Sequence, residues 1–297
     1  MKFPSELLSV FPEHASIPKI IHQVYFSKTL PAEIQKNVEK ITALNPGWEY
    51  RFYDDADMID FIRSNYGARI LAYYNRINKK YGASRADLFR YLLMYKVGGV
   101  YIDIKGSLEK PLDQVLRSDD VYLLSRWRNA KGERYEGWGV HDELKAIGGE
   151  EYQQWHIIAA AGHPFLRAVI DNVLRNIDRY NPVLDDVGKG AVLRLSGPIA
   201  YTLSITPLLA QYSHRVVDGQ DDLGLTYSIY SSNSNWAHKS IFRFHYTDLR
   251  EPVTELTGSK KLVWSLLGPV QIHIIRRTRN IATALSKRFA AMSQRRG

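Results

Sequence analysis

The sequence predicts an α/β fold with a parallel or mixed central sheet. Strand-like and helix-like segments alternate along the first half of the 297-residue chain, and such alternation is typical of this fold class. The composition, with 45% hydrophobic and 24% charged residues, is ordinary for a soluble globular protein. The length is sufficient for one large α/β domain or two small ones.

Hydrophobic periodicity predicts five elements ahead of the central stretch: strands at 17–26 and 48–53, and helices at 31–44, 54–66 and 68–80. Asp54 and Asp55 begin the second of these helices. Acids in a first helical turn suit the helix dipole, so capping is favoured over catalysis as their role.

Residues 83–105 form the most informative stretch of the chain. Apolar residues recur there with helical spacing, which predicts a helix with one face against the core. Gly98 and Gly99 end that helix, because paired glycines allow the positive φ angles of a sharp reversal. A short strand at 100–102 follows, and Asp103 stands where it ends. Ligands of α/β proteins bind at the carboxyl ends of strands, so Asp103 is a candidate site residue.

These residues resemble glycosyltransferase family 32, whose pattern is an Asp, an Arg three residues on, and then Gly-Gly-x-Tyr-x-Asp-x-Asp. The family contains initiating mannosyltransferases and bacterial capsule and O-antigen enzymes, with the clostridial glucosylating toxins as distant relatives. Six positions match: Asp87, Arg90, Gly98, Gly99, Tyr101 and Asp103. Lys105 stands in place of the last acid. The resemblance implies a GT-A-type, Rossmann-like nucleotide-sugar-binding domain with a mixed sheet over residues 1–258.

The resemblance also implies roles for individual residues. Asp103 and Arg90 are expected to act in catalysis, and Lys105, which departs from the family pattern, is a third catalytic candidate because of its charge. Donor binding is expected from a larger set: Asp87, Arg90, Tyr101, His22, Gln23, Tyr25, Gly98, Gly99, Ser234 and Trp236.

Two parts of that set have alternatives of equal weight. His22, Gln23 and Tyr25 end a segment like the family's opening strand, which lies under the base and ribose in Rossmann-like folds. His22 is equally consistent with a satisfied core histidine. Ser234 and Trp236 resemble the Ser-x-Trp loop that closes over the donor in the toxin enzymes, and a surface turn is the alternative.

A departing nucleoside diphosphate needs positive charge where its own charge develops. A metal ion can supply it, and so can an Arg or a Lys. Asp103 and His245, which resembles a late family histidine near the diphosphate, are the expected ligands of a divalent cation, Mn²⁺ or Mg²⁺. Because Lys105 replaces the second DXD acid, we expect its ammonium to take over part of the cation's role. The alternative is a solvated lysine beyond the strand end.

Later segments predict strands at 121–124, 155–160, 226–230 and 241–245, and helices at 164–180 and 198–209. The loop at 126–149 is rich in Trp and Gly and is expected to pack on the surface or to offer a platform for the acceptor sugar, from Trp127, Trp138, His141 and Asp142. The Ser196-Gly197-Pro198 motif opens the last helix and is expected either to cap it or to bind an anion through the amides at that helix start. Gln154 is the nearest match to a family amide.

The net charge of +9 belongs to the last part of the chain, since nine basic and no acidic residues follow Glu255. Residues 262–275 lack charge but are shorter than the ~20 residues that a bilayer span needs. On a helical wheel, the residues from Val270 onward form an apolar stripe beside basic residues, so 259–297 is predicted to be a basic amphipathic helical segment of the kind that lies on an anionic membrane surface. A helix packed on the body and a nucleic-acid patch are the less favoured alternatives, and no nucleic-acid partner is expected.

The predicted function is transfer of a sugar from a nucleotide sugar to a glycan, possibly lipid-linked, in bacterial surface polysaccharide synthesis. The resemblance implies retention of configuration. The chain lacks Cys, which favours a reducing compartment, and its start lacks the apolar core of a signal peptide. The expected location is therefore cytoplasmic, peripheral on the inner face of the membrane. A non-catalytic relative that binds nucleotide sugar or glycan is the alternative.

Overall fold

The protein is described by a computed structural model over residues 6–230 and 245–270. A six-stranded sheet forms its centre, in the order β2 (Glu49–Tyr53), β1 (Ile20–Val24), β3 (Gly99–Ile102), β6 (His156–Ala159), β5 (Tyr122–Leu124) and β7 (Arg215–Val216). β1 is parallel to β2 and β3, and β5 is parallel to β7. β6 is antiparallel to both of its neighbours. The predicted mixed α/β sheet is confirmed.

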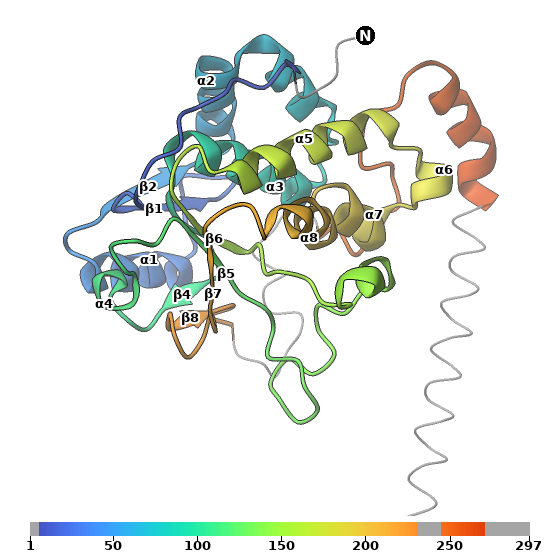
Figure 1. The fold of residues 1–297 in the computed structure, drawn as a ribbon. Coiled ribbons are helices and arrows are strands. Elements are labelled where there is room, and N and C mark those ends of the chain that lie inside the picture. Colours follow the sequence, from blue (N-terminus) through green and yellow to red (C-terminus); the bar gives the residue numbers. More distant parts are fainter. Residues whose placement is uncertain (1–5, 231–244, 271–297) are drawn as a thin grey trace, which may run out of the picture.

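Helices cover both faces of this sheet (Figure 1). α2 (Asp55–Arg76), α3 (Gly82–Val97) and α5 (Pro164–Arg179) lie on one face, and α1 (Ala32–Leu44) and α4 (Leu112–Val115) lie on the other. The remaining elements are α6 (Pro182–Asp185), α7 (Gly188–Leu195), α8 (Pro198–Ile205), the 3₁₀ helices η2 (Asp142–Ile147) and η3 (Thr206–Leu208), a small sheet of β4 (Ser107–Leu108) with β8 (Leu225–Thr226), and a helix at 258–270.

The two core regions follow from alternation along the strands. Tyr101 of β3 packs with residues of α2, α3 and α5. Its neighbours Val100 and Ile102 pack on the opposite face with Ile41 of α1 and Leu112 of α4. Successive side chains of a strand point to opposite faces, so a four-residue apolar strand contributes to both cores.

The paired glycines form the predicted turn between α3 and β3. Gly98 has φ 70° and ψ −167°, a region that essentially only glycine occupies. A Cβ at Gly98 would lie 2.6 Å from the backbone nitrogen of Ala161, and a Cβ at Gly99 would lie 2.5 Å from the carbonyl oxygen of Ile20. The turn therefore fits tightly between the end of β6 and β1.

Several element boundaries differ from the sequence prediction. The helices expected at 54–66 and 68–80 form one kinked helix, α2, because Gly67 interrupts it with φ 77° and ψ −179°. The expected strand at 226–230 is wrong, since only Leu225 and Thr226 pair, with β4. Residues 241–244 of the other expected late strand lie outside the described residues.

Asp54 has the capping role favoured by the sequence. Its carboxylate accepts hydrogen bonds from the backbone nitrogens of Ala56 and Asp57, and the Asp57 side chain accepts in return from the backbone nitrogen of Asp54. This reciprocal pair satisfies donors that a helix start leaves without partners.

We expect Gly98→Ala to destabilise the fold by about 2–5 kcal/mol, because the new Cβ meets backbone atoms and the backbone angles suit glycine alone. Urea unfolding followed by circular dichroism measures this change. Gly47→Ala is the matched control, since a Cβ there meets nothing within 4 Å. Equal stability of the two variants would contradict the tight fit of the turn.

Candidate functional site

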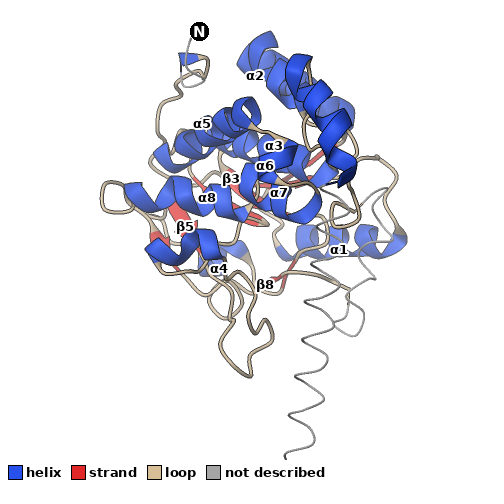
Figure 2. Cartoon of the chain, turned by 90° about the vertical axis from the view of Figure 1, so that its right-hand side faces the viewer, coloured by secondary structure: helices blue, strands red, loops and turns tan. Residues whose placement is uncertain are grey.

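One edge of the sheet collects the candidate residues. The carboxyl ends of β1, β3 and β5 meet there, and so does the amino end of β6, because β6 runs the opposite way. Asp103 directly follows β3, and Gln154 lies just before β6. Figures 1 and 2 show the long connections gathered at this edge, away from α2 and α5.

The guanidinium of Arg90 contacts both Asp87 and Asp103, the two acids on which the sequence prediction depends. Arg90 lies on α3 and is 4% exposed. Its Nη2 is 3.1 Å from Oδ1 of Asp87, and its Nη1 is 3.0 Å from Oδ1 of Asp103. The structure therefore brings Asp87, Arg90 and Asp103 together in one cluster, across the glycine turn.

Other groups complete the surroundings of the guanidinium. Arg90 Nη1 donates to the carbonyl oxygen of Gln154 at 2.8 Å, and its Cζ lies 4.8 Å from the centre of the Tyr101 ring. Burial works against the charge of Arg90, but the negative charge of Asp103 and other neighbours outweigh it and raise the pKa of Arg90. Arg90 is thus a fixed positive charge within the cluster.

Asp87 is buried, and both of its carboxylate oxygens have partners. Oδ1 accepts from Nε2 of Gln154 at 3.2 Å as well as from Arg90, and Oδ2 accepts from the hydroxyl of Ser196 at 2.8 Å. Burial raises the pKa of Asp87 to about 6, although Arg90 and the Ser196 hydrogen bond lower it. Protonation of this carboxyl near pH 6 would weaken its interaction with Arg90.

Ser196 holds Asp87 and does not cap the following helix. The N-cap of α8 is Gly197, and no side chain makes a capping hydrogen bond there. The Ser196-Gly197-Pro198 motif thus begins α8, with Gly197 as its N-cap and Pro198 in its first turn, while the Ser196 hydroxyl binds Asp87.

Asp103 is the accessible acid of the cluster. Its side chain is 24% exposed, compared with 4% for Asp87. Its Oδ1 accepts from the hydroxyl of Tyr101 at 3.1 Å and contacts Arg90. Within the described residues its Oδ2 makes no hydrogen bond, so that oxygen can accept a ligand.

Lys105 is buried, so its interpretation as a solvated residue is wrong. Only 8% of the residue is exposed, and its Nζ donates to the hydroxyl of Tyr227 at 2.7 Å. Burial lowers the pKa of Lys105, whereas the charge of Asp103 raises it. The segment after β8 also covers this residue, since the backbone nitrogen of Ile229 donates to the Lys105 carbonyl oxygen at 2.9 Å.

His22 and Gln23 of β1 hold the backbone beside the cluster, at Gly98 and Asp103. His22 is fully buried, and its Nε2 donates to the carbonyl oxygen of Gly98 at 2.9 Å while Nδ1 accepts from the hydroxyl of Tyr53 at 3.2 Å. Burial lowers the pKa of His22 to about 4, so the ring is neutral. These partners favour the core-histidine interpretation.

Gln23 and Tyr25 are also buried. Gln23 Nε2 donates to the carbonyl oxygen of Asp103 at 3.3 Å, and its Oε1 accepts from the hydroxyl of Tyr50 at 2.9 Å. The Tyr25 ring packs against Phe26 at 4.2 Å between centroids. Gln23 therefore fixes the backbone from which the Asp103 side chain projects.

A divalent cation can bind at this site through Oδ2 of Asp103. Mg²⁺ is often held by one or two carboxylates together with substrate phosphates and waters, and Oδ2 of Asp103 can serve as such a ligand. Within residues 6–230 and 245–270, no three His, Asp or Glu side chains form a metal-binding group. His245, the other expected ligand, has its Nδ1 2.8 Å from the hydroxyl of Thr247. Ser234 and Trp236 lie outside the described residues.

Sequence reasoning missed Tyr227 and Tyr246 as members of the site. Burial raises the pKa of Tyr246, and the charges of Lys105, Asp87 and Asp103 act on it too, so its phenol belongs to the cluster's surroundings. Tyr227 lies inside the strand predicted at 226–230, and Tyr246 directly follows His245. Nothing in the local pattern links either of them to Asp103.

Parts of this chain are similar in sequence to known proteins. Residues 31–122 match the protein family described as "Glycosyltransferase sugar-binding region containing DXD motif". An inositol phosphoceramide mannosyltransferase of Schizosaccharomyces pombe is 28% identical over 57% of this chain and 40% of its own length. A mannosyl phosphorylinositol ceramide synthase of Saccharomyces cerevisiae is 34% identical over 35% of this chain and 27% of its own length. The alignments thus span less than half of these relatives.

A solved structure, the UDP-bound glycosyltransferase domain from the YGT toxin, shares the fold, with a TM-score of 0.50 over 75% of this chain and 83% of that one, at 9% identity. The matched family region contains every residue from Asp87 to Lys105, including the positions of the DXD motif. Residues 31–122 are therefore similar to the sugar-binding region of a DXD glycosyltransferase family, and the α/β fold is similar to that of a glycosyltransferase domain.

Proposed function

We propose that this chain transfers a hexose from a nucleoside diphosphate sugar to a glycan or lipid-linked acceptor, with retention of anomeric configuration. One observation carries the proposal: Arg90 joins Asp87 and Asp103 at the carboxyl edge of the sheet and leaves Oδ2 of Asp103 accessible. The family match over this stretch and the mannosyltransferase names of the fungal relatives support it.

The donor binds at the carboxyl ends of β1 and β3. In the order β2-β1-β3, the chain runs from β1 to the neighbouring strand on one side and from β3 toward the other side. Such a topological switch point is where open α/β sheets bind nucleotides. The diphosphate then lies beside Asp103, with the Lys105 ammonium next to it. Arg90 is buried and acts by holding Asp87 and Asp103 in place.

The leaving diphosphate becomes more negative as the glycosidic bond breaks. Lys105 stabilises that charge in a site shielded from water, where such stabilisation is strong. A divalent cation held by Asp103 would supply further positive charge to the diphosphate. In front-face transfer the departing phosphate accepts the acceptor's proton, so the site needs no separate general base.

The relatives' names bear on the acceptor. They refer to inositol phosphoceramide and to mannosyl phosphorylinositol ceramide, which supports a glycolipid acceptor in preference to a free oligosaccharide. The bacterial polysaccharide context implied by the family resemblance stays a prediction, because the relatives compared above are fungal.

The helix at 258–270 presents an apolar stripe to solvent. Leu262, Leu266 and Val270 are 63%, 67% and 57% exposed, and Val263 and Leu267 lie beside them. Nine basic residues and no acid follow Glu255. An apolar stripe joined to a basic segment fits an anionic membrane surface, where basic residues contribute about 1 kcal/mol each. We therefore include a membrane surface among the partners.

None of the helices in the described part of the chain has both the length and the apolar character needed to cross a bilayer.

We expect donor turnover to fall as the pH drops through about 6, because protonated Asp87 no longer holds Arg90 by charge. An acid with a raised pKa is ionised above that value, so the active form exists above pH 6 and is lost below it. Asp87→Asn should remove this dependence of turnover on pH near 6 and lower turnover by about 100-fold. Turnover is measured as released nucleoside diphosphate. Asp60→Asn, an exposed control, should keep the wild-type profile. A flat wild-type profile between pH 5 and 8 would contradict this role of Asp87.

We expect the wild-type enzyme to keep donor turnover within about tenfold when EDTA replaces Mn²⁺, because Lys105 supplies positive charge. Lys105→Asp rebuilds the second DXD acid, and its metal-free turnover should fall at least about 100-fold. UDP- and GDP-hexoses are the donors, and Lys110→Asp is the exposed control.

A strict metal requirement in the wild type would refute the role of Lys105. Donor binding without turnover, with or without Mn²⁺, would instead favour a non-catalytic relative.

Deletion of residues 259–297 should abolish sedimentation with anionic phosphatidylserine vesicles and leave the circular dichroism of the body unchanged. Full-length Leu262→Glu/Leu266→Glu should weaken sedimentation, because it places charge on the apolar stripe. Neutral phosphatidylcholine vesicles are the control. Continued sedimentation of the truncated protein would show that the membrane assignment is wrong.

A further inference from the structure

The ammonium of Lys105 depends on one phenol for its orientation. Its Nζ donates to the hydroxyl of Tyr227 at 2.7 Å and lies 4.0 Å from the centre of the same ring. Within the described residues this ammonium pairs with no carboxylate, and the nearby Asp103 contacts Arg90 instead. A lysine side chain is a flexible four-carbon stem, so a phenol in a fixed place is needed to keep the charge in one position.

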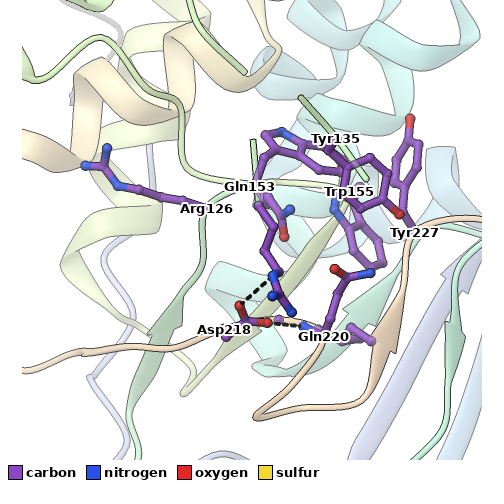
Figure 3. A pocket seen from close by; sticks show the side chains of 11 residues that line it. Arg126, Tyr135, Gln153, Trp155, Asp218, Gln220 and Tyr227 are labelled. Carbon is purple, nitrogen blue, oxygen red and sulfur yellow. Dashed lines mark hydrogen bonds and ion pairs between the residues drawn. The ribbon is translucent and has the colours of Figure 1, made fainter. Parts of the chain in front are cut away.

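The Tyr227 ring is held by aromatic residues of the connection between β5 and β6. Its centre lies 5.0 Å from that of Trp127 at 85° and 5.4 Å from that of Trp155 at 72°. Tyr135 packs on Trp127 in turn, at 4.9 Å between ring centres. Figure 3 shows Tyr135, Trp155 and Tyr227 grouped together. We call these four residues the aromatic group; edge-to-face contacts of this kind hold rings in place.

The aromatic group is packed without room to shift. The cavity that its rings line has a volume of about 10 Å³, room for at most one water. The backbone at Gly139 closes on the indole, since a Cβ there would lie 2.4 Å from Cδ1 of Trp127. Closely packed groups transmit displacements to one another, so the position of Trp127 determines that of Tyr227.

The carboxylate of Glu151 fixes the indole of Trp127. Its Oε1 accepts from Nε1 of Trp127 at 2.6 Å, and its Oε2 lies 2.5 Å from Nε2 of His141. Glu151 is 6% exposed, and its backbone nitrogen donates to the carbonyl oxygen of Gly139 at 2.8 Å. A buried carboxylate needs hydrogen-bond partners, and here both oxygens have one. Glu151 is therefore itself fixed in place.

The charge of Glu151 also acts on the phenol. Burial raises the pKa of Tyr227, and the negative charges of Asp103 and Glu151 raise it further. The phenol is therefore neutral, and its oxygen remains an acceptor for Lys105. A continuous series of contacts thus leads from Glu151 through Trp127 and Tyr227 to Lys105.

The neighbouring acid, Glu150, takes no part in this series. Its side chain is 38% exposed and pairs with Arg126 at 3.3 Å. In Figure 3 the Arg126 side chain extends away from the aromatic group. Two adjacent acids of the same type therefore differ in whether they contact Trp127, which makes Glu150 a matched control for Glu151.

We propose that Glu151 is a positioning residue for Lys105. Its carboxylate fixes the Trp127 indole, the indole holds the Tyr227 phenol, and the phenol orients the ammonium. This inference rests on the proposed function for the task of Lys105 at the diphosphate, but not for the placement of Lys105. A functional group is effective only when the residues around it hold it in place, so Glu151 contributes to the rate without contacting the donor.

Site-resolved acetylation of the full-length protein with acetic anhydride, followed by mass spectrometry, tests the placement without turnover. Glu151→Ala should raise the acetylation rate of Lys105 about tenfold, because the series loses a hydrogen bond to a charged group. Glu151→Gln should stay within about twofold of the wild type, since its amide oxygen still accepts from Trp127. Trp127→Phe keeps a ring but removes the donor, so it should act like Glu151→Ala.

Glu150→Ala is the matched control, and the acetylation rate of the exposed Lys110 is the internal reference in every variant. A rise at Lys105 in Glu151→Ala and Trp127→Phe that Glu151→Gln and Glu150→Ala do not share supports the proposal. An unchanged rate in both Glu151→Ala and Trp127→Phe overturns it, as does an equal rise in Glu150→Ala.

Donor turnover with Mn²⁺ tests the consequence for the reaction. Glu151→Ala should lower kcat about tenfold and leave KM for the donor nearly unchanged. In a Lys105→Met background it should have no further effect, because residues that act through one another are not additive. Equal losses in the two backgrounds overturn the proposal. Absence of turnover in the wild type would refute the proposed function, and the acetylation rates would still decide the placement of Lys105.

Discussion

The buried guanidinium of Arg90 is the constraint on which the rest of this site depends. A charge removed from water is stable only if neighbouring groups compensate it. Here Asp87, Asp103 and the Gln154 carbonyl oxygen supply that compensation from three separate parts of the chain. The need to satisfy one cation therefore fixes α3, the end of β3 and the approach to β6 relative to one another.

Local patterns of the sequence were sufficient to predict the glycine turn between α3 and β3 and the charged residues Asp87, Arg90 and Asp103 on either side of it. Asp87 and Arg90 are one helical turn apart, and Gly98 and Gly99 have backbone angles that suit glycine, so both features are encoded by neighbours in sequence. The GT-A-like fold followed from the resemblance and from strand–helix alternation.

Long-range contacts could not be predicted in this way. Ser196 lies 109 residues from its partner Asp87, and Lys105 is buried by Tyr227, 122 residues away. A lysine after a strand is usually solvated, and no local pattern indicates the phenol that covers this one. Alternation also predicts that a segment is a strand without giving its direction, so the antiparallel orientation of β6 emerged only from its pairing.

That reversal of β6 has a consequence for how the protein can diversify. The chain leaves β5 at the edge where Asp103 lies and re-enters the sheet from the same edge, so the excursion from Ser125 to Trp155 begins and ends at two neighbouring points. The middle of such an excursion can lengthen or shorten without moving a strand, whereas Gln154 near its end is held by Arg90 and Asp87. Under the proposed function, changes in that middle part would alter one side of the site and leave Asp87, Arg90 and Asp103 in place.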